Sequence, residues 1–300
     1  MKRFISMLGI SGIIAGSALF AQQPHARVDS SRTALDSKIE VYQKENISSK
    51  APIPLSQVKE VDVFQEWTIW REIDLRLKEN YSLYYPIAPT KIIGSRVNFF
   101  TLLMQGIESG EITAYHPLPV SDEFSEVITY EQIRQNPSIQ QADRTEMQVS
   151  IHTNNDTTIF IPGKNLLDDE NIQRIIVKEK WFFDKKRSVL ECRVIGISPV
   201  FMYLDPVSDQ IRRIAVCWIY MDEARPLLAR HPVFNNFNEA QNISYDDFFM
   251  QNRYKGRIIR EGNVFNNRYI EDYATGVDIL YEGQRIENKI FDWEQDRWEY

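Results

Sequence analysis

The chain has little of the chemistry that catalysis and metal binding use. Its 300 residues hold two cysteines and four histidines, and no histidine lies within four residues of another histidine or of a cysteine. The motifs HExxH, CxxC, GxSxG and GxGxxG and the phosphate-binding P-loop are all missing from the sequence. The sequence therefore predicts a protein without enzyme activity, cofactor or metal ion.

Carboxylates are the exception to this scarcity. They cluster at 168–170, 222–223 and 246–247, and they recur at Asp292, Glu294 and Asp296. A glycosidase needs only two acids that converge in a cleft, so a carbohydrate-active enzyme remains an alternative. A protein that binds a carbohydrate or another small molecule is a second alternative. Because clustered acids are most often solvated, we favour a structural role over both.

Basic residues are in deficit over the whole chain. Thirty-five Lys and Arg stand against 42 Asp and Glu, a formal charge of −7, which disfavours nucleic acid as a partner. The segment 171–230 differs from the rest, with eleven basic against seven acidic residues. A basic middle between acidic flanks suits head-to-tail contact between identical subunits, or docking to an oppositely charged protein.

Long apolar runs are missing after the first 20 residues. Before that point, two basic residues precede an apolar run from Phe4 to Phe20, and small residues follow. This pattern predicts a secretory signal peptide at 1–21 that is cleaved near 18–21. No cysteine follows it to carry a lipid, and no later run is long enough to span a bilayer. We therefore expect an exported chain that reaches a membrane only through a partner.

The remaining chain divides into an arm and a domain. Residues 22–60 are polar, and we interpret them as an extended arm that is either disordered or laid along another molecule. Residues 61–300 are rich enough in apolar side chains for an α+β domain, which could divide into two lobes near residue 165. Apolar residues at steps of three and four predict helices at 61–80, with its charged side in solvent, and at 97–108.

Strand-forming residues concentrate in the centre of this domain. Runs at 172–184, 187–199 and 211–221 are rich in β-branched and aromatic residues, and short polar turns separate them. These runs predict an antiparallel meander. The fold class is therefore α+β, with a central antiparallel β-sheet meander, flanking helices at both ends and an extended N-terminal arm.

Weaker patterns lie on either side of the meander. Short strands are expected at 148–152 and 157–161, with a turn between them where Thr157 resembles an O-glycosylation acceptor. After the meander, we expect helices at 238–252 and 254–262.

The two cysteines are not expected to form a disulfide. If the last two runs form a hairpin that turns through 205–210, Cys217 lies opposite Ser198 and Cys192 lies six residues along the strand. That separation is about 20 Å at 3.3 Å per residue, too far for a disulfide. The sequence therefore predicts that Cys192 and Cys217 are free, buried thiols.

Several sequence blocks resemble the GldN/PorN family of the gliding motility and type IX secretion apparatus of Bacteroidetes. They are "IWREIDL", "YYP", "KEKWFFDKKRSVLECRVIGISP", "CWIYMDEARPLLA", "HPVFN" and "YIEDY", in this order from about Asp62 to the C-terminus. The arm at 22–60 carries little of the resemblance. A signal peptide without a lipid-bearing cysteine agrees with it.

The resemblance implies a non-catalytic periplasmic subunit. Members of this family assemble with an outer-membrane lipoprotein, GldK/PorK, into rings beneath the outer membrane. They are linked to the inner-membrane motor proteins GldL/PorL and GldM/PorM. By resemblance, we expect the same partners, self-association in a ring and the same location for this chain, and no catalytic residues are implied.

Two charged turns are the candidate contacts with partners. The first is Asp184, Lys185, Lys186 and Arg187, a basic hairpin tip that an acidic neighbour could bind. The second is Asp222, Glu223 and Arg225, where Pro226 is expected to end the strand and expose a charged corner.

Overall fold

The computed structural model describes residues 49–87, 92–93, 96–117, 124–136, 139, 144–149, 156–161, 167, 169–205, 210–235, 238 and 241–297. The predicted signal peptide and residues 22–48 of the predicted arm lie outside the described residues. The described residues belong to one compact unit, 40–300. Among them, no helix is long and apolar enough to cross a membrane.

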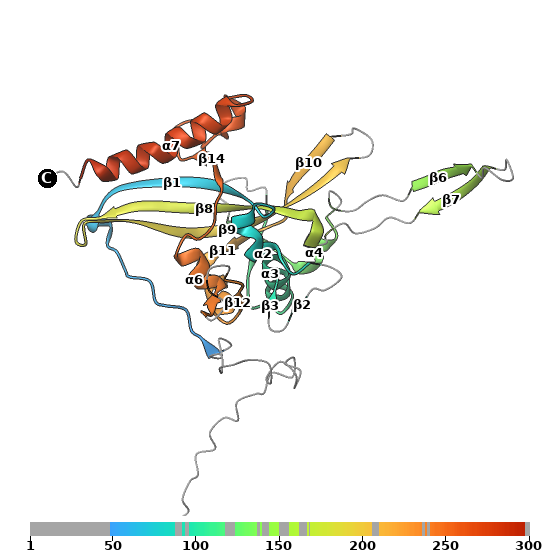
Figure 1. The fold of residues 1–300 in the computed structure, drawn as a ribbon, viewed down its shortest axis with the longest axis horizontal. Coiled ribbons are helices and arrows are strands. Elements are labelled where there is room, and N and C mark those ends of the chain that lie inside the picture. The colour runs from blue at the N-terminus through green and yellow to red at the C-terminus, as the bar shows by residue number, and fades with distance from the viewer. Residues whose placement is uncertain are drawn as a thin grey trace, which may run out of the picture. The chain divides into compact units, whose positions relative to one another are not determined.

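One large antiparallel sheet organises this unit (Figure 1). Its strands follow the order β14-β1-β8-β9-β11-β4-β5, and β10 adds a further pairing to β9. The strands are β1 Val63–Asp74, β4 Ala114–Tyr115, β5 Val127–Ile128, β8 Ile172–Asp184, β9 Val189–Asp205, β10 Gln210–Ala215, β11 Trp218–Tyr220 and β14 Arg257–Glu261. The sheet takes strands from both sides of residue 165. Together with the helices around it, the sheet confirms the predicted α+β class.

The central meander has the predicted register. β10 pairs with β9 from Gln210 opposite Asp205 to Ala215 opposite Val200, so the hairpin turns where the sequence predicts. The register shifts by one residue at β11, where Ile219 lies opposite Ile197. A shift of one residue leaves the two cysteines far apart along the ladder, and both are free.

The predicted helix at 61–80 is wrong. Residues Val63–Asp74 form strand β1, which pairs with β8 over its whole length and with β14 through residues 69–72. Its aromatic and β-branched residues fit a half-buried strand as well as they fit a helical stripe. Strands β8 and β14 supply hydrogen-bond partners for the backbone of β1 on both of its edges. These partners lie far away in the sequence, so the periodicity of residues 61–80 does not reveal them.

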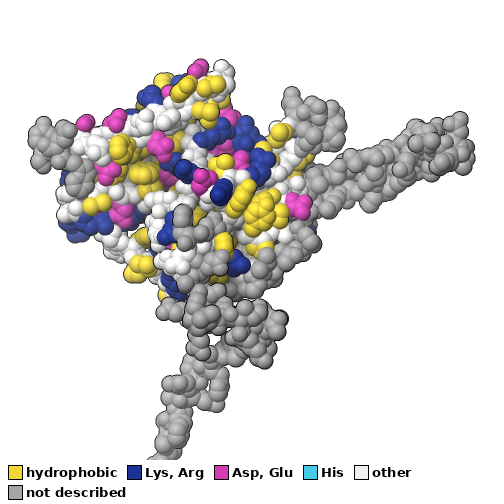
Figure 2. Space-filling view, in the orientation of Figure 1, with side chains coloured by type: hydrophobic (Ala, Val, Ile, Leu, Met, Phe, Trp, Pro, Cys, Tyr) yellow, Lys and Arg dark blue, Asp and Glu magenta, His cyan; other side chains and the backbone are white. Residues whose placement is uncertain are grey.

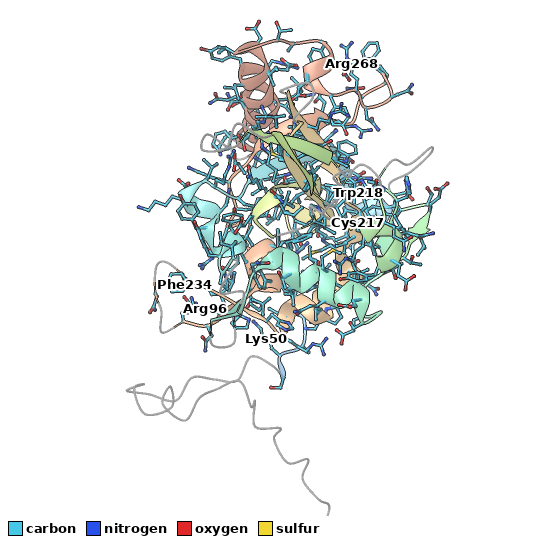
Figure 3. The ribbon with its side chains drawn as sticks, turned by 90° about the vertical axis from the view of Figure 1, so that its right-hand side faces the viewer. Lys50, Arg96, Cys217, Trp218, Phe234 and Arg268 are labelled. Carbon is cyan, nitrogen blue, oxygen red and sulfur yellow. The ribbon has the colours of Figure 1, made fainter. Side chains whose placement is uncertain are left out.

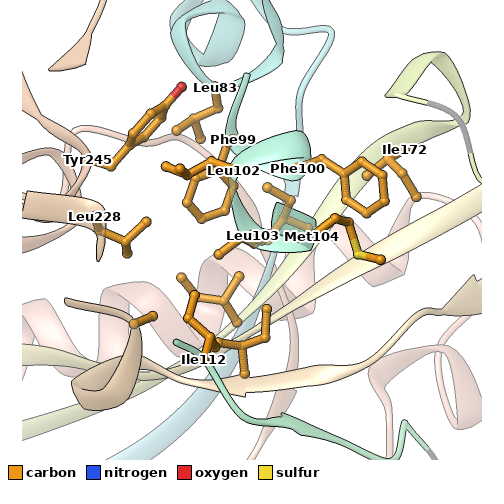
Figure 4. Packing of buried hydrophobic residues seen from close by; sticks show 14 of the residues in the cluster. Leu83, Phe99, Phe100, Leu102, Leu103, Met104, Ile112, Ile172, Leu228 and Tyr245 are labelled. Carbon is orange, nitrogen blue, oxygen red and sulfur yellow. The ribbon is translucent and has the colours of Figure 1, made fainter. Parts of the chain in front are cut away.

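Helices cover the sheet and build the main core. The predicted helix at 97–108 is α3, Phe99–Glu108, which begins where the Asn98 side chain accepts a hydrogen bond from Thr101 N at 2.7 Å. It ends before Gly110, which has a φ of 74°. The short helices are α2 Tyr81–Tyr84, α4 Tyr130–Arg134, α5 Met221–Ala229 and α6 Tyr245–Met250. Residues from α2, α3, α5 and α6 meet the sheet in one hydrophobic cluster (Figure 4).

The C-terminal region differs from the prediction. Residues 257–261, expected in a helix, form β14 at the edge of the sheet, and the described residues of 238–252 include the short helix α6 in place of one long helix. The long helix α7, Asp278–Gln295, was not predicted. Its Ile286 and Ile290 join Ile69 and Ile258 in a second buried cluster, so α7 lies on β1 and β14.

Small two-stranded ladders complete the described structure. They pair β2 Ile92–Ile93 with β3 Arg96–Val97, β6 Arg144–Val149 with β7 Asp156–Ile161, and β12 Pro232–Val233 with β13 Ile243–Ser244. Strands β6 and β7 are the two predicted short strands, displaced by a few residues. Thr157 therefore lies in β7 and not in the turn where it was expected.

Candidate interaction surfaces

The charged turn between β8 and β9 is held together from within. The Asp184 side chain is buried and accepts hydrogen bonds from Lys186 N at 2.8 Å and from Arg187 Nε at 2.7 Å. The bond from the Arg187 guanidinium lowers the pKa of Asp184, and Arg187 also binds Glu191. Asp184 is therefore a structural residue of the turn and is not positioned to contact a partner.

The three cations of this turn face solvent, and acidic side chains lie beneath Lys186 and Arg187. The Lys186 side chain is 65% exposed, and its Nζ lies 2.7 Å from an Asp62 carboxylate that is only 17% exposed. Lys185 Nζ lies 5.5 Å from the centre of the Phe64 ring. In the space-filling view, Lys and Arg side chains gather at the end of the molecule where this turn lies (Figure 2).

Exposed apolar side chains surround these cations. Val61 is 82% exposed, and Phe64 and Val189 are about half exposed. We define the hairpin tip as these residues together with the cations of the turn: Val61, Phe64, Lys185, Lys186, Arg187 and Val189. The structure thus adds an apolar component to a surface that the sequence presented as charge alone.

The second predicted contact region is a helix and not an open corner. Strand β11 ends at Tyr220, and Asp222, Glu223 and Pro226 lie within α5. The prediction that Pro226 ends the strand is therefore wrong. Asp222 and Pro226 are both exposed, so the proline, which has no N–H to donate to the Asp222 carbonyl, lies on the outer side of the helix.

Arg225, which was predicted to contact a partner, is buried within the domain. Its guanidinium binds the Asp246 carboxylate through Nε at 2.9 Å and through a terminal nitrogen at 3.2 Å. It also donates a hydrogen bond to the Ile53 carbonyl. Arg225 therefore joins α5 to α6 and to the segment before β1, and of the three predicted contact residues only Asp222 and Glu223 lie on the surface.

The described part of the predicted arm lies along its own domain. An Arg193 terminal nitrogen donates hydrogen bonds to the Ser56 carbonyl at 2.8 Å and to Ser56 Oγ at 3.0 Å. Lys50, labelled in Figure 3, forms an ion pair with Asp247 of α6. A single 3₁₀ turn, Glu60–Asp62, then leads into β1. Residues 49–62 are therefore fixed by side chains of the folded domain.

A buried network of charges joins β1, β8 and the C-terminal region. Glu179 is 1% exposed and accepts hydrogen bonds from Arg71 Nε at 2.9 Å, Trp181 Nε1 at 2.9 Å and Tyr254 OH at 3.0 Å. Burial opposes the charge of Arg71, but the carboxylates of Glu179 and Glu287 outweigh burial and raise its pKa. Because the acid accepts hydrogen bonds from several parts of the chain, it is positioned to hold the fold together.

Glu72 forms a second centre beside the first. Its carboxylate lies 2.9 Å from an Arg174 nitrogen and 2.6 Å from an Arg257 nitrogen. A cavity of about 660 Å³ adjoins both centres, and its charged lining residues include Arg71, Arg174, Glu72 and Glu179. Because these acids and bases bind one another, the cavity presents paired charges and not two free carboxylates of the kind that glycoside hydrolysis requires.

The two free cysteines are shielded from solvent to different degrees. Cys217 is completely buried, and burial raises the pKa of its thiol to about 12. Cys192 is partly buried, and both burial and the nearby Glu179 carboxylate raise the pKa of its thiol. Both groups are therefore neutral thiols in the folded protein at neutral pH.

We expect neither thiol to react quickly with an aromatic disulfide reagent at pH 8 while the protein is folded. Absorbance should report almost no fast reaction in buffer and two thiols per chain in denaturant, because only the thiolate reacts. The pKa of both thiols is higher in the folded than in the unfolded protein, so the protonated thiols contribute to the stability of the fold. That contribution should be complete below about pH 8.5 and should be lost as the pH rises toward the folded-state pKa values of the thiols. One fast thiol in the folded protein would contradict the burial of one of these cysteines.

An apolar surface that the sequence did not predict lies before and at the start of α7. Val264 is 90% exposed and Phe265 is 63% exposed, and Val277, Leu280 and Tyr281 are each more than half exposed. Arg268, labelled in Figure 3, lies 4.7 Å from the Phe265 ring centre and 4.3 Å from the Tyr273 ring centre. We define the C-terminal platform as these seven residues.

The platform is held in a fixed conformation by local hydrogen bonds. Asn266 and Asn267 have φ values of 56° and 54°, a left-handed conformation that asparagine tolerates. Asn267 Oδ1 accepts a hydrogen bond from Asn263 N at 2.9 Å, and Asn263 Oδ1 accepts one from Phe265 N at 3.0 Å. The dipeptide Asn266-Asn267, a turn signal beside two apolar residues, was the clue in the sequence.

The charged groups of the described residues include no set suited to metal binding: no three His, Cys, Asp or Glu side chains are grouped to hold an ion. Among the features that the described fold does present are two exposed apolar surfaces beside charged residues and an internally paired charge network. Exposed apolar surfaces of this kind are typical of proteins that bind other proteins.

The described fold is an α+β domain built on one large antiparallel sheet. Residues 58–299 match the family model described as GldN, gliding motility associated protein GldN, and the chain belongs to this family. It is therefore a component of the gliding motility and type IX secretion machinery. The members of this family are structural components of that machinery, and the family is not a known enzyme family. No individual curated protein matches the chain.

Proposed function

We propose that this protein is a non-catalytic periplasmic subunit that assembles into a ring at the inner face of the outer membrane. Its partners would be an outer-membrane lipoprotein of the GldK/PorK type and a motor protein of the GldM/PorM type. The observation that carries the proposal is the family match over residues 58–299. The uneven charge of the chain and its exposed apolar surfaces support it.

Affinity capture of the tagged mature protein from gently solubilised envelopes tests this proposal. We expect mass spectrometry to identify a lipoprotein of the GldK/PorK type and negative-stain imaging to show ring-shaped particles. Envelopes from cells that express the untagged protein are the control. Recovery of a lone monomer, with neither lipoprotein nor particles, would contradict the proposal.

Reversing the charge of the hairpin tip should reduce the yield of this assembly. Replacing Lys185, Lys186 and Arg187 together by Glu is expected to weaken association by about tenfold at low salt, because like charges then face an acidic neighbour. The difference should shrink at high salt, where charges are screened. The matched control replaces Arg76, Lys78 and Lys255, which are also exposed, by Glu. An unchanged yield of assembly would remove the tip from the contact.

A further inference from the structure

Strand β10 has one paired edge and one open edge. Along one edge it is bonded to β9, and no described strand pairs with the other. Val216 N donates to the Pro199 carbonyl at 2.9 Å, so in this ladder every second residue of β10 points its backbone groups toward β9. The alternate residues point their N–H and C=O groups away from β9, and these groups bond to no other described residue: Ile211, Arg213 and Ala215.

The sheet is only two strands wide at this end. Strand β8 pairs with β9 as far as Phe201, and beyond it β9 and β10 form a ribbon that stands apart from the helices in Figure 1. A two-stranded ribbon is marginally stable in water, and a third strand would stabilise it. The ends of the main strand order offer less open edge, because Tyr269 bridges β14 at Arg260 and β5 has two residues.

The backbone of β10 has none of the features that prevent a strand edge from pairing. Its six residues include no proline or glycine, and its register with β9 has no shift. Charged side chains are a further protection, and Arg212 and Arg213 are exposed. Side chains project from the faces of a strand, however, and the Arg213 guanidinium binds Glu271 at 3.1 and 3.2 Å. The backbone groups at the edge therefore remain accessible.

We propose that β10 is a docking edge, to which an extended segment of a partner protein adds as a further strand. Unpaired N–H and C=O groups at every second residue match the spacing of a second extended backbone, and a helix cannot supply that spacing. The inference goes beyond the proposed function, because it assigns a mode of binding and a conformation of the partner segment that membership of the family does not specify.

The side chains of β10 define the chemistry of this segment further. Ile211 is 66% exposed, so an apolar side chain opposite it would remove both groups from water. Residues 210–215 include two arginines and no acid, and Arg213 shares Glu271 with Arg257. The edge therefore fits a segment in which apolar residues alternate with polar residues that include a carboxylate.

Photo-cross-linking identifies the segment. The tagged mature protein with Ile211→Cys is labelled with a benzophenone maleimide and irradiated with gently solubilised envelopes, and the unmodified chain measures any label at the native thiols. We expect mass spectrometry of the digested product to map the cross-link to one short segment of another protein with the alternating pattern. Val277→Cys is the matched position, because Val277 is 62% exposed but lies at the start of α7, and its products should lack that segment.

Adding Arg213→Pro to the Ile211→Cys protein tests the backbone pairing. Proline removes the outward N–H of residue 213 and keeps the ladder bonds to β9, which the residues on either side make. Arg213→Ala is the control, because it loses the same ion pair with Glu271 and keeps the N–H. The yield of the cross-linked segment should fall about tenfold with proline and stay within about twofold with alanine.

A synthetic copy of the cross-linked segment gives a readout that needs no substitution. In hydrogen exchange followed by NMR, the amides of Arg212 and Ile214 should exchange slowly in the protein alone, and those of Ile211 and Arg213 quickly. Saturating peptide should slow the fast pair by about tenfold or more and leave the slow pair unchanged, because an added strand bonds only the outward groups.

Two kinds of result would overturn the inference. Equal cross-linking in the proline and alanine variants, or unchanged exchange at Ile211 and Arg213 with the peptide bound, would show that the segment does not pair with the edge. The same products from Ile211→Cys and Val277→Cys, a cross-link only to a second copy of this chain, or no cross-link at all would show that β10 does not dock a partner segment.

Discussion

Replacing Glu179 with leucine is expected to lower the free energy of unfolding by about 3–5 kcal/mol. Glu179 is 1% exposed and accepts hydrogen bonds from Arg71, Trp181 and Tyr254. Leucine would leave the buried Arg71 guanidinium with one carboxylate partner, Glu287, which is largely exposed. It would also leave the Trp181 N–H without its Glu179 acceptor and the Tyr254 hydroxyl with the longer hydrogen bond to Asn252 Oδ1 at 3.3 Å, and a donor left unpaired has a further cost.

Thermal unfolding followed by circular dichroism measures this loss. For a domain of this size, about 4 kcal/mol corresponds to a fall of roughly 10 °C in Tm. The control is Glu66→Leu. Glu66 and Lys180 form another ion pair between β1 and β8, but that pair is exposed. Its loss should change stability by less than about 1 kcal/mol. A Glu179→Leu protein as stable as Glu66→Leu would show that the network adds nothing to the fold.

A double substitution tests whether the unpaired charge causes the loss. In the protein with Arg71→Met and Glu179→Leu, no buried cation lacks its partner, so stability should recover in part. The recovery should be incomplete, because the Trp181 N–H still lacks its Glu179 acceptor and Tyr254 has lost the shorter of its two hydrogen bonds. If the double variant is less stable than Glu179→Leu by the full cost of Arg71→Met, the two residues act independently and the ion pair is not the cause.

The charges of β1 show why the sequence predicted this region wrongly. Arg71 and Glu72 were assigned to the solvent side of a helix, yet both are buried in the sheet. Their partners, among them Glu179 and Arg257, lie more than 100 residues away along the chain. A periodic pattern records only neighbours in the sequence, so it cannot report a charge that is neutralised by a distant strand.

The meander was predicted correctly because its information is local. The turn between β9 and β10 fixes the register of the strands that flank it, so counting from the turn placed Cys217 near Ser198. The charged residues 184–187 between two strand-forming runs predicted the turn between β8 and β9, which lies at 185–188.

The C-terminal platform was missed because its apolar residues follow no single period. They lie partly in a loop ordered by asparagine turns and partly on the outer side of α7. The inner side of α7 does carry a helical pattern, at Ile279, Gly283, Ile286 and Ile290. A search for that spacing would have predicted helix α7 from the sequence.

Replacing Phe99 with alanine is expected to lower the free energy of unfolding by about 3–5 kcal/mol, because a large cavity would form where α3 meets α6. Phe99 is completely buried. The centre of its ring lies 5.3 Å from that of Tyr245 and 5.1 Å from that of Phe249. The buried Tyr245 hydroxyl donates to the Val97 carbonyl at 2.8 Å, which fixes one wall of the site and limits its collapse.

Chemical denaturation followed by tryptophan fluorescence measures the effect of this cavity. Phe291→Ala is the matched control, since Phe291 lies on α7 and is 58% exposed, and its loss should cost less than about 0.5 kcal/mol. Phe99→Leu should lie between the two, because leucine fills part of the space. If Phe99→Ala loses less than about 1 kcal/mol, then α3 and α6 close over the gap, and the hydrogen bond from Tyr245 does not hold them apart as the structure indicates.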